Sequence, residues 1–134
     1  MAHDVWSQLA GVASRKWMGV YLRVLAVVYA LGGLVHIGNI LGLGDIPWSS
    51  SPTAWRVGDV AYGVIDVVAS LGLWRRAPWG VIAFVVAACS QLVLYLGWPD
   101  VFAFTREQRS ALQGLVMTHI ATLLGLAALW IARK

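Results

Sequence analysis

Four long apolar runs dominate this chain and leave few folds open to it. They cover roughly residues 19–43, 55–74, 78–98 and 110–131. Each approaches or exceeds the ~20 residues that an α-helix needs to cross a ~30 Å hydrocarbon core. None shows the strict two-residue alternation of a membrane β-barrel strand, and a helix satisfies its backbone polar groups internally. The runs therefore predict an all-α fold: an integral membrane bundle of four antiparallel helices.

Composition excludes a soluble domain of this size. Of the 134 residues, 60% are hydrophobic and 12% are charged, and the mean hydropathy is +0.74. Six acidic and ten basic residues cannot supply a hydrated exterior, so the apolar side chains must face lipid. We expect one four-helix membrane domain over residues 17–134.

Residues 1–16 are predicted to be a cytoplasmic or interfacial segment. Two alternatives stay open for it. It either forms a short amphipathic helix with Val5, Trp6, Leu9 and Val12 toward lipid, or it is a frayed tail.

The basic residues predict an orientation. Seven of the ten lie where the ends of the runs would share one membrane side: Arg15, Lys16, Arg23, Arg75, Arg76, Arg133 and Lys134. The other three are Arg56, Arg106 and Arg109. The positive-inside rule puts the seven in the cytoplasm, so we expect a multi-pass protein of the bacterial inner membrane with both termini cytoplasmic. Because the basic residues cluster at run ends rather than along a stripe, the net charge of +4 does not indicate a nucleic-acid partner.

Tryptophan gives the same answer as charge. Four tryptophans flank the predicted inner ends of the runs: Trp17, Trp74, Trp79 and Trp130. Three flank the outer ends: Trp48, Trp55 and Trp98. Aromatic belts of this kind mark the two membrane interfaces.

A layer of polar residues is predicted inside the bundle. At a rise of ~1.5 Å per residue, His36 lies about 10 Å and Asp66 about 15 Å from the outer ends of their helices. Gln91 and His119 come out at about 10 Å and 14 Å. Since alternate runs point in opposite directions, four helices contribute to one layer in the outer half. Asp59 precedes Asp66 by seven residues and shares its helix face.

Several interpretations of this layer stay open. The side chains can hydrogen-bond to one another and hold the helices in register, at roughly 1 kcal/mol per contact. His36 and His119 could instead ligate a b-type haem in a slot between the first and fourth helices, where Gly32, Gly33 and Gly125 offer small surfaces. A quinone or lipid pocket, a His–Asp–His metal site and a proton relay are also open. The candidate cofactor-binding residues are His36, His119, Asp66 and Gln91.

Motifs of catalysis are absent from the sequence. It contains no GxSxG, HExxH or CxxC pattern and no glycine loop for phosphate. We therefore predict no catalytic residue and assign no residue as a metal ligand, and an enzyme is less expected than a non-catalytic membrane protein. Gly38 and Gly42 form a GxxxG pattern that would allow close helix approach. Thr105 to Gln108 has the pattern of a helix start that leads into the fourth run.

Two stretches carry a resemblance. The first run contains ALGGLVHIGNILGLG, and the second closes with GLWRRAPWG. In these features and in its layout the chain resembles the DoxX-like families of small bacterial four-helix membrane proteins, most of which are uncharacterised. The resemblance covers the whole layout but rests on general features of membrane turns, and it assigns no functional residue. Because some members are associated with redox chemistry or quinones, it implies a slight preference for a haem or quinone site.

Three functional hypotheses follow. Short loops leave little surface outside the bilayer, which favours an accessory or structural subunit of a larger inner-membrane complex, of a redox or energy-converting kind, or of a homo-oligomer. The alternative is a redox or ligand-binding membrane module that holds a b-type haem, a metal or a quinone near His36 and His119. The third is a small transporter or channel subunit with a water path past Asp59 and Asp66.

Overall fold

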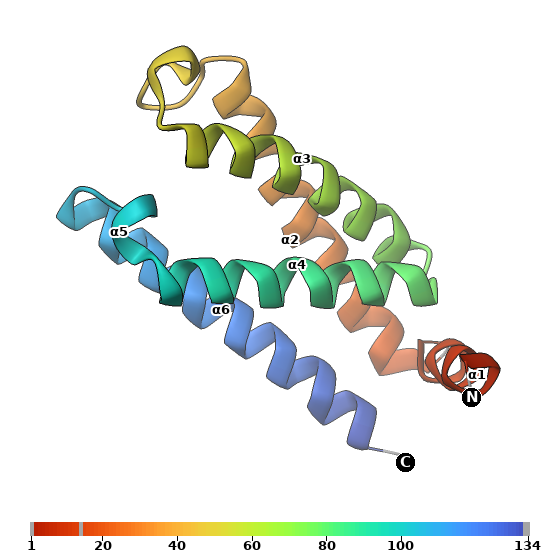
Figure 1. Ribbon diagram of the computed structural model, residues 1–134. Helices are drawn as coiled ribbons and strands as arrows, with labels where there is room; N and C mark the ends of the chain where they lie inside the picture. The colour runs from red at the N-terminus through yellow and green to blue at the C-terminus, as the bar shows by residue number, and fades with distance from the viewer. Residues whose placement is uncertain (1, 14, 133–134) are drawn as a thin grey trace.

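The computed structural model describes residues 2–13 and 15–132, and this part of the chain contains helices and loops but no strand (Figure 1). The elements in order are α1 (Ala2–Ala13), α2 (Lys16–Ile40), the 3₁₀ turn η1 (Trp48–Ser50), α3 (Thr53–Trp74), α4 (Pro78–Gly97), α5 (Pro99–Phe102) and α6 (Arg106–Ile131). Four of them, α2, α3, α4 and α6, are long and apolar enough to cross a membrane. The all-α class and the four long helices are therefore confirmed. Helix α2 begins and ends three residues earlier than the predicted first membrane helix, and α6 begins four residues earlier than the predicted fourth.

The four long helices alternate in direction, so their ends gather at two ends of the molecule (Figure 1). We call the end with α1, the α3–α4 turn and the C-terminal end of α6 the terminal end. The opposite end, with the α2–α3 loop and α5, is the loop end. At the terminal end the guanidinium of Arg15 donates to the carbonyl of Ala132, 3.4 Å away. Arg133 and Lys134, which entered the predicted orientation, lie outside the described residues, and the orientation stays a prediction.

The end of α2 corrects the interpretation of the GxxxG pattern. Gly42 lies beyond the helix with φ +79°, in the left-handed region that glycine adopts without strain. Its N–H donates to the carbonyl of Asn39 at 3.0 Å, and the N–H of Leu43 donates to that of Gly38 at 2.9 Å. These two bonds form a Schellman motif. Gly42 therefore terminates α2 and provides no helix-packing surface.

The turn between α3 and α4 brings two helix backbones together. Arg76, two residues beyond α3, has φ +56°, and the N–H of Ala77 donates to the carbonyl of Gly72 at 2.9 Å. A Cβ on Gly72 would meet the Cα of Gly80, and a Cβ on Gly80 would meet the backbone of Gly72. The two helices pack here backbone to backbone, which only glycine permits.

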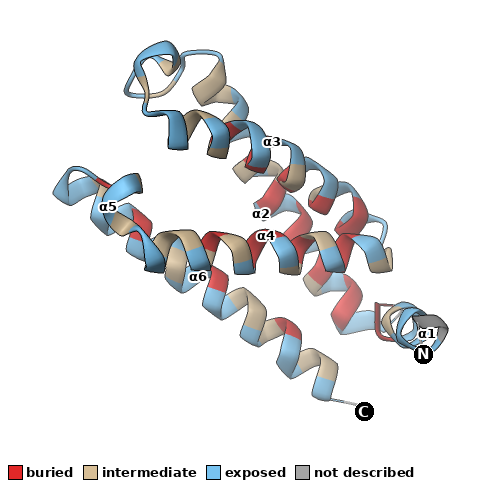
Figure 2. Cartoon of the chain, in the orientation of Figure 1, coloured by how far each residue is buried: buried red, intermediate tan, exposed pale blue. Residues whose placement is uncertain are grey.

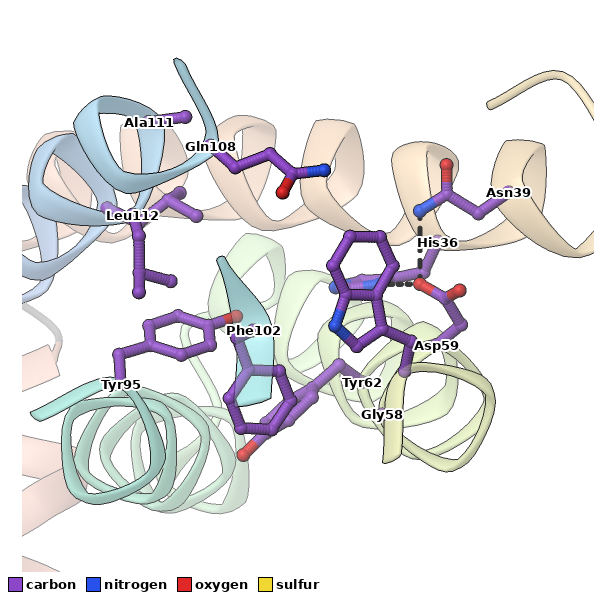
Figure 3. Close-up of a pocket in the computed structure, with 12 residues that line it drawn as sticks. His36, Asn39, Gly58, Asp59, Tyr62, Tyr95, Phe102, Gln108, Ala111 and Leu112 are labelled. Carbon is purple, nitrogen blue, oxygen red and sulfur yellow. Dashed lines mark hydrogen bonds and ion pairs between the residues drawn. The ribbon is translucent and has the colours of Figure 1, made fainter. Parts of the chain in front are cut away.

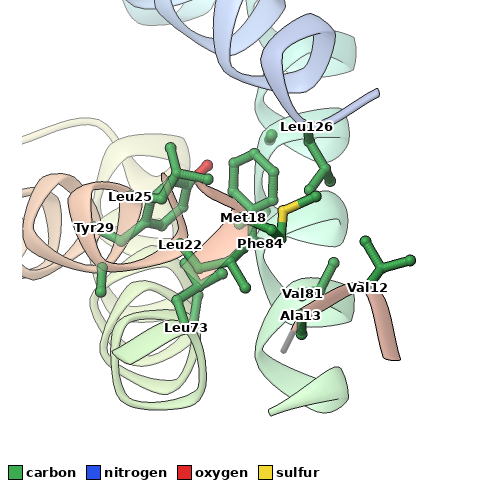
Figure 4. Close-up of a cluster of buried hydrophobic side chains, with 14 residues drawn as sticks. Val12, Ala13, Met18, Leu22, Leu25, Tyr29, Leu73, Val81, Phe84 and Leu126 are labelled. Carbon is green, nitrogen blue, oxygen red and sulfur yellow. The ribbon is translucent and has the colours of Figure 1, made fainter. Parts of the chain in front are cut away.

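The apolar core lies toward the terminal end. Figure 4 shows its side chains. Its largest fully buried side chains are Phe84, Leu22, Leu25 and Leu73. Tyr29 packs edge-on against Phe84, with ring centroids 5.3 Å apart and an interplanar angle of 85°. This cluster joins α2, α3 and α4 and closes the terminal half of the bundle.

The N-terminal segment is a helix, as one of the two alternatives predicted. Val5 and Trp6 are exposed, as expected for a lipid-facing side. Leu9 and Val12 differ from the prediction, because they pack against the core cluster beside Met18 rather than pointing away from the protein. The apolar side chains of Leu9 and Val12 on α1 thus cover the terminal end of the core.

The connection between α4 and α6 is fixed to α3. The indole N–H of Trp55 donates to the carbonyl of Val101 at 2.8 Å, and its ring stacks on Phe104 with centroids 5.6 Å apart. Thr105 then starts α6 through a capping box. Its hydroxyl accepts from the N–H of Gln108 at 3.2 Å, and the Gln108 side chain accepts from the N–H of Thr105 at 3.0 Å. The predicted helix start is confirmed.

The buried residues of helix α6 lie along one narrow line. They are Leu112, His119 and Leu126, each seven positions after the last. Much of α6 is exposed or half-buried, as its pale blue and tan segments show (Figure 2). Apolar side chains such as Met117 and Leu124 are exposed. We call Leu112, His119 and Leu126 the seam of α6. Because the seam has one buried residue every two turns, it leaves space between α6 and the bundle, and the cavities described below lie in that space.

Candidate functional site

The polar residues of α3 share one face. The buried positions of this helix include Asp59, Tyr62, Asp66, Ala69 and Leu73, spaced three or four residues apart. This is the spacing of one helical face, so the prediction that Asp59 and Asp66 point the same way is confirmed. The same helix face supplies the core with Leu73 at the terminal end and the site with two carboxylates toward the loop end.

His36 of α2 lies between these two carboxylates. Its Nδ1 is 2.9 Å from Oδ1 of Asp59, and its Nε2 is 3.9 Å from Oδ2 of Asp66. The amide of Asn39, one helical turn further on, donates to the same oxygen of Asp59 at 3.1 Å (Figure 3). Side-chain exposure falls from 18% at His36 and 11% at Asp59 to 5% at Asp66, so Asp66 is the most buried of the three.

Glycines make room for this arrangement. A Cβ on Gly32 would lie 2.8 Å from Oδ2 of Asp66, so the carboxylate occupies the space that a side chain on α2 would need. A Cβ on Gly33 would lie 3.3 Å from a methyl of Val67. The close approach of α2 and α3 and the position of Asp66 both depend on these two glycines.

Two cavities meet at His36. The first, which we call the vestibule, has a volume of about 330 Å³ and lies toward the loop end, lined by Asn39, Trp55, Asp59, Phe102 and Gln108 among others (Figure 3). The second, which we call the cleft, has a volume of about 300 Å³ and lies between α6 and the rest of the bundle, with Tyr29, Asp66, Gln91 and His119 on its walls. His36, Tyr95 and Leu115 line both.

Three polar atoms at the cleft are buried without a hydrogen-bond partner among the described residues. They are the hydroxyl of Tyr29, Oδ1 of Asp66 and Nε2 of His119. Each such group costs roughly 1–3 kcal/mol when no partner replaces water. They come from α2, α3 and α6, which makes a single local packing defect a poor explanation. The rest of the lining is largely apolar, with Val28, Leu31, Val35 and Leu115.

All four candidate residues from the sequence line the cleft: His36, Asp66, Gln91 and His119. The predicted layer therefore exists as a set of neighbours, while its role as a cofactor site stays a prediction. Thr118 and Thr122 also line the cleft, but their hydroxyls donate to carbonyls of their own helix. Gln113 is exposed and lies beside a different cavity, on the other side of α6.

Sequence reasoning missed two tyrosines of the site, Tyr29 and Tyr95. Tyr29 lies seven residues before His36 and so on the same face of α2, a signal that was present. Tyr95 lies between the two cavities, and Tyr62 donates from its hydroxyl to Ser90 at 3.0 Å. A tyrosine in an apolar run does not indicate a polar site as a charged or amide side chain does, because aromatic residues are common in membrane helices.

The predicted haem slot fits the structure poorly. Of the three glycines that were to form it, Gly32 faces the Asp66 carboxylate, Gly33 faces Val67, and Gly125 lies beside the hydroxyl of Tyr21, 2.6 Å from where a Cβ would be. These surfaces are therefore already covered by side chains. Within the described ranges, no group of three or more His, Cys, Asp or Glu side chains is arranged to hold a metal ion.

A family comparison places the chain. Residues 16–133 match the description "Family of unknown function (DUF6163)". The chain belongs to this family. No curated protein and no solved structure matches it. The match covers all four long helices but leaves the DoxX-like resemblance a prediction, and the family description names no activity, so function has to be argued from the geometry of the site.

Proposed function

We propose that this protein is a multi-pass membrane protein whose cleft binds a lipid-soluble molecule with a polar head, of which a quinone is the best-fitting class. The observation that carries the proposal is the trio of unpartnered buried atoms around one cavity. A polar head inserted among them would supply the missing hydrogen bonds, and an apolar tail would be at home along the valine and leucine side chains.

Membrane insertion is supported by the surface of the four long helices. Valine and leucine side chains are exposed along α2, α3 and α4, with Val24, Leu34, Val64 and Val93 each more than half exposed. In water such a surface would drive aggregation, whereas in a bilayer it is the expected lipid contact. An inner-membrane location and cytoplasmic termini remain part of the proposal, on the charge and tryptophan patterns described above.

The polar groups suit a ring with two oxygens. Tyr29 and Gln91 offer hydrogen-bond donors, and His119 offers a donor or an acceptor at Nε2 according to its tautomer. A quinone carbonyl accepts such bonds. After reduction the corresponding hydroxyl donates, and Oδ1 of Asp66, which has no partner among the described residues, is the acceptor that would receive it. Both the quinone and the reduced quinol would therefore find hydrogen-bond partners on the walls of the cleft.

Entry requires α6 to move slightly. The three unpartnered atoms are sealed from water-sized contact, although the residues that carry them line the cleft. The terminal half of α6 is held to the core by Leu126, by the partly buried Leu123, Leu129 and Trp130, and by the hydroxyl of Tyr21, which donates to the carbonyl of Thr122. Toward the loop end the buried residues of α6 are Leu112 and His119, so this half of the helix can part from the bundle at modest cost and admit a molecule from the lipid side.

The test is to titrate the protein in nanodiscs with a short-tailed ubiquinone analogue and to measure binding by the quenching of tryptophan fluorescence. We expect saturable binding that His119→Leu weakens by about tenfold, the equivalent of a lost hydrogen bond in a buried site. Gln113→Leu, on the opposite side of the same helix, is the matched control and should bind like the wild type. A visible spectrum of protein from its native membrane, oxidised and dithionite-reduced, tests the haem alternative. Equal binding of the ubiquinone analogue by the His119→Leu and Gln113→Leu variants would refute the proposed quinone site.

An accessory or structural subunit is the second candidate. The observation that favours it is the large exposed apolar surface of α6, where Met117, Leu124 and Ile131 are each more than 60% exposed. Lipid covers such a surface as well as a partner subunit would. Purification in a mild detergent separates the two, because a subunit comes away with its larger partners at fixed stoichiometry.

A further inference from the structure

Three side chains connect the two cavities in an ordered series. Asp59 lines the vestibule but not the cleft, and Asp66 lines the cleft but not the vestibule. His36 lines both and has one ring nitrogen toward each carboxylate, at 2.9 Å and 3.9 Å. An imidazole between two carboxylates is the arrangement that passes protons, because it accepts at one nitrogen and releases at the other.

We propose that Asp59, His36 and Asp66 form a proton pathway from the loop end of the molecule to the cleft. The pathway rests on the proposed function, since it would serve the molecule bound in the cleft, but it can be tested without that molecule.

Each step conserves charge and atoms. A hydronium ion in the vestibule protonates the Asp59 carboxylate and leaves water, and Asp59 passes the proton to the unprotonated Nδ1 of His36, which forms an imidazolium. The imidazolium releases its Nε2 proton to Oδ2 of Asp66, which a small rotation of the carboxylate brings from 3.9 Å to hydrogen-bond distance. The result is a neutral Asp66 carboxyl and a neutral His36, which began with its proton on Nε2 and ends with its proton on Nδ1.

The surroundings give the pathway one open end. The titratable groups that face His36 are Asp59, Asp66 and Tyr62 from α3, Tyr95 from α4 and His119 from α6, and Tyr29 of α2 lines the same cleft. Beyond Tyr29, which packs on Phe84, the terminal end of the bundle is filled by the fully buried side chains of Phe84, Leu22 and Leu73, which hold no proton acceptor. Protons therefore reach Asp66 from the loop end.

The experiment measures the protonation of Asp66 from each side. The protein is placed in vesicles, and the pH is changed on one side at a time before brief exposure to dicyclohexylcarbodiimide, which reacts with protonated carboxyls in apolar surroundings. Mass spectrometry then gives the fraction of Asp66 labelled. The side of the loop end is found in each preparation with a membrane-impermeant maleimide on Ser50→Cys, in a Cys89→Ala background.

We expect Asp66 labelling to rise at least ~5-fold when the pH at the loop end falls by roughly two units, and to change less than ~2-fold for the same step at the terminal end. His36→Gln and Asp59→Asn should abolish the response, and a circular dichroism melt shows that each variant is folded. Asp45→Asn, on the exposed α2–α3 loop, is the control and should respond like the wild type.

Three results would overturn the pathway: labelling that follows the pH at the terminal end, labelling that ignores pH on both sides, or a full response in folded His36→Gln protein. A failure of ubiquinone binding would remove the proposed function and leave the labelling result standing. The two proposals therefore fail separately.

Discussion

Replacing Gly32 by alanine should weaken ligand binding without unfolding the protein. A Cβ at this position would lie 2.8 Å from Oδ2 of Asp66, whereas ordinary contact begins at 3.4 Å, so the carboxylate must retreat by about 0.6 Å, the difference of the two distances. The atom in the way is the end of a side chain rather than backbone, which makes the adjustment inexpensive for folding. The other oxygen of the same carboxylate is the acceptor that the bound molecule would use.

The expected loss is about 1 kcal/mol, the net value of one hydrogen bond, which raises the Kd for the ubiquinone analogue by about fivefold. Titration of the nanodisc-embedded protein measures it. Gly114→Ala on α6 is the matched control, because a Cβ there meets nothing within 4 Å in the described part of the chain. If the two alanine variants bind the analogue equally well, the position assigned to Asp66 at the binding site is wrong.

Three further predictions concern the fold around the site. Gly80→Ala should lower the free energy of unfolding in detergent by roughly 1–3 kcal/mol, since the new Cβ overlaps the facing backbone of α3; an unchanged unfolding curve would contradict the close crossing. Thr105→Ala should cost about 1 kcal/mol by removing the cap of α6, and Thr105→Ser should restore it, so equal losses for both variants would exclude capping as the cause. A double-mutant cycle of His36→Leu and Asp59→Leu should give a coupling energy of about 1 kcal/mol, and additive effects would mean that their hydrogen bond contributes nothing to stability.

Much of this arrangement could be predicted because it depends on periodicity and composition. The long helices follow from apolar runs, and the polar layer follows from counting positions in runs of alternating direction. The pairing of His36 with Asp59 and Asp66 needs only the seven-residue spacing on α3 and a neighbouring helix at the right depth. These are properties of single helices that survive packing.

What could not be predicted depends on how helices end and meet. Gly42 looked like part of a packing motif, but its backbone conformation makes it a helix terminator, which spacing alone cannot reveal. The line of buried residues on α6 could not be predicted, because this helix carries apolar side chains on all its faces, as any membrane span does. Val12 of α1 packs inward although Val5, two turns earlier on the same face, is exposed, because the core reaches only the C-terminal end of α1.

The most direct test of the central claim is an experimental structure of the protein extracted with its native lipids into nanodiscs. The proposal predicts density for a ring-shaped head in the cleft, within hydrogen-bond distance of Nε2 of His119 and Oδ1 of Asp66, and a tail that leaves beside α6. A cleft closed by its own side chains, with those two atoms bonded to protein groups or to water alone, would contradict it.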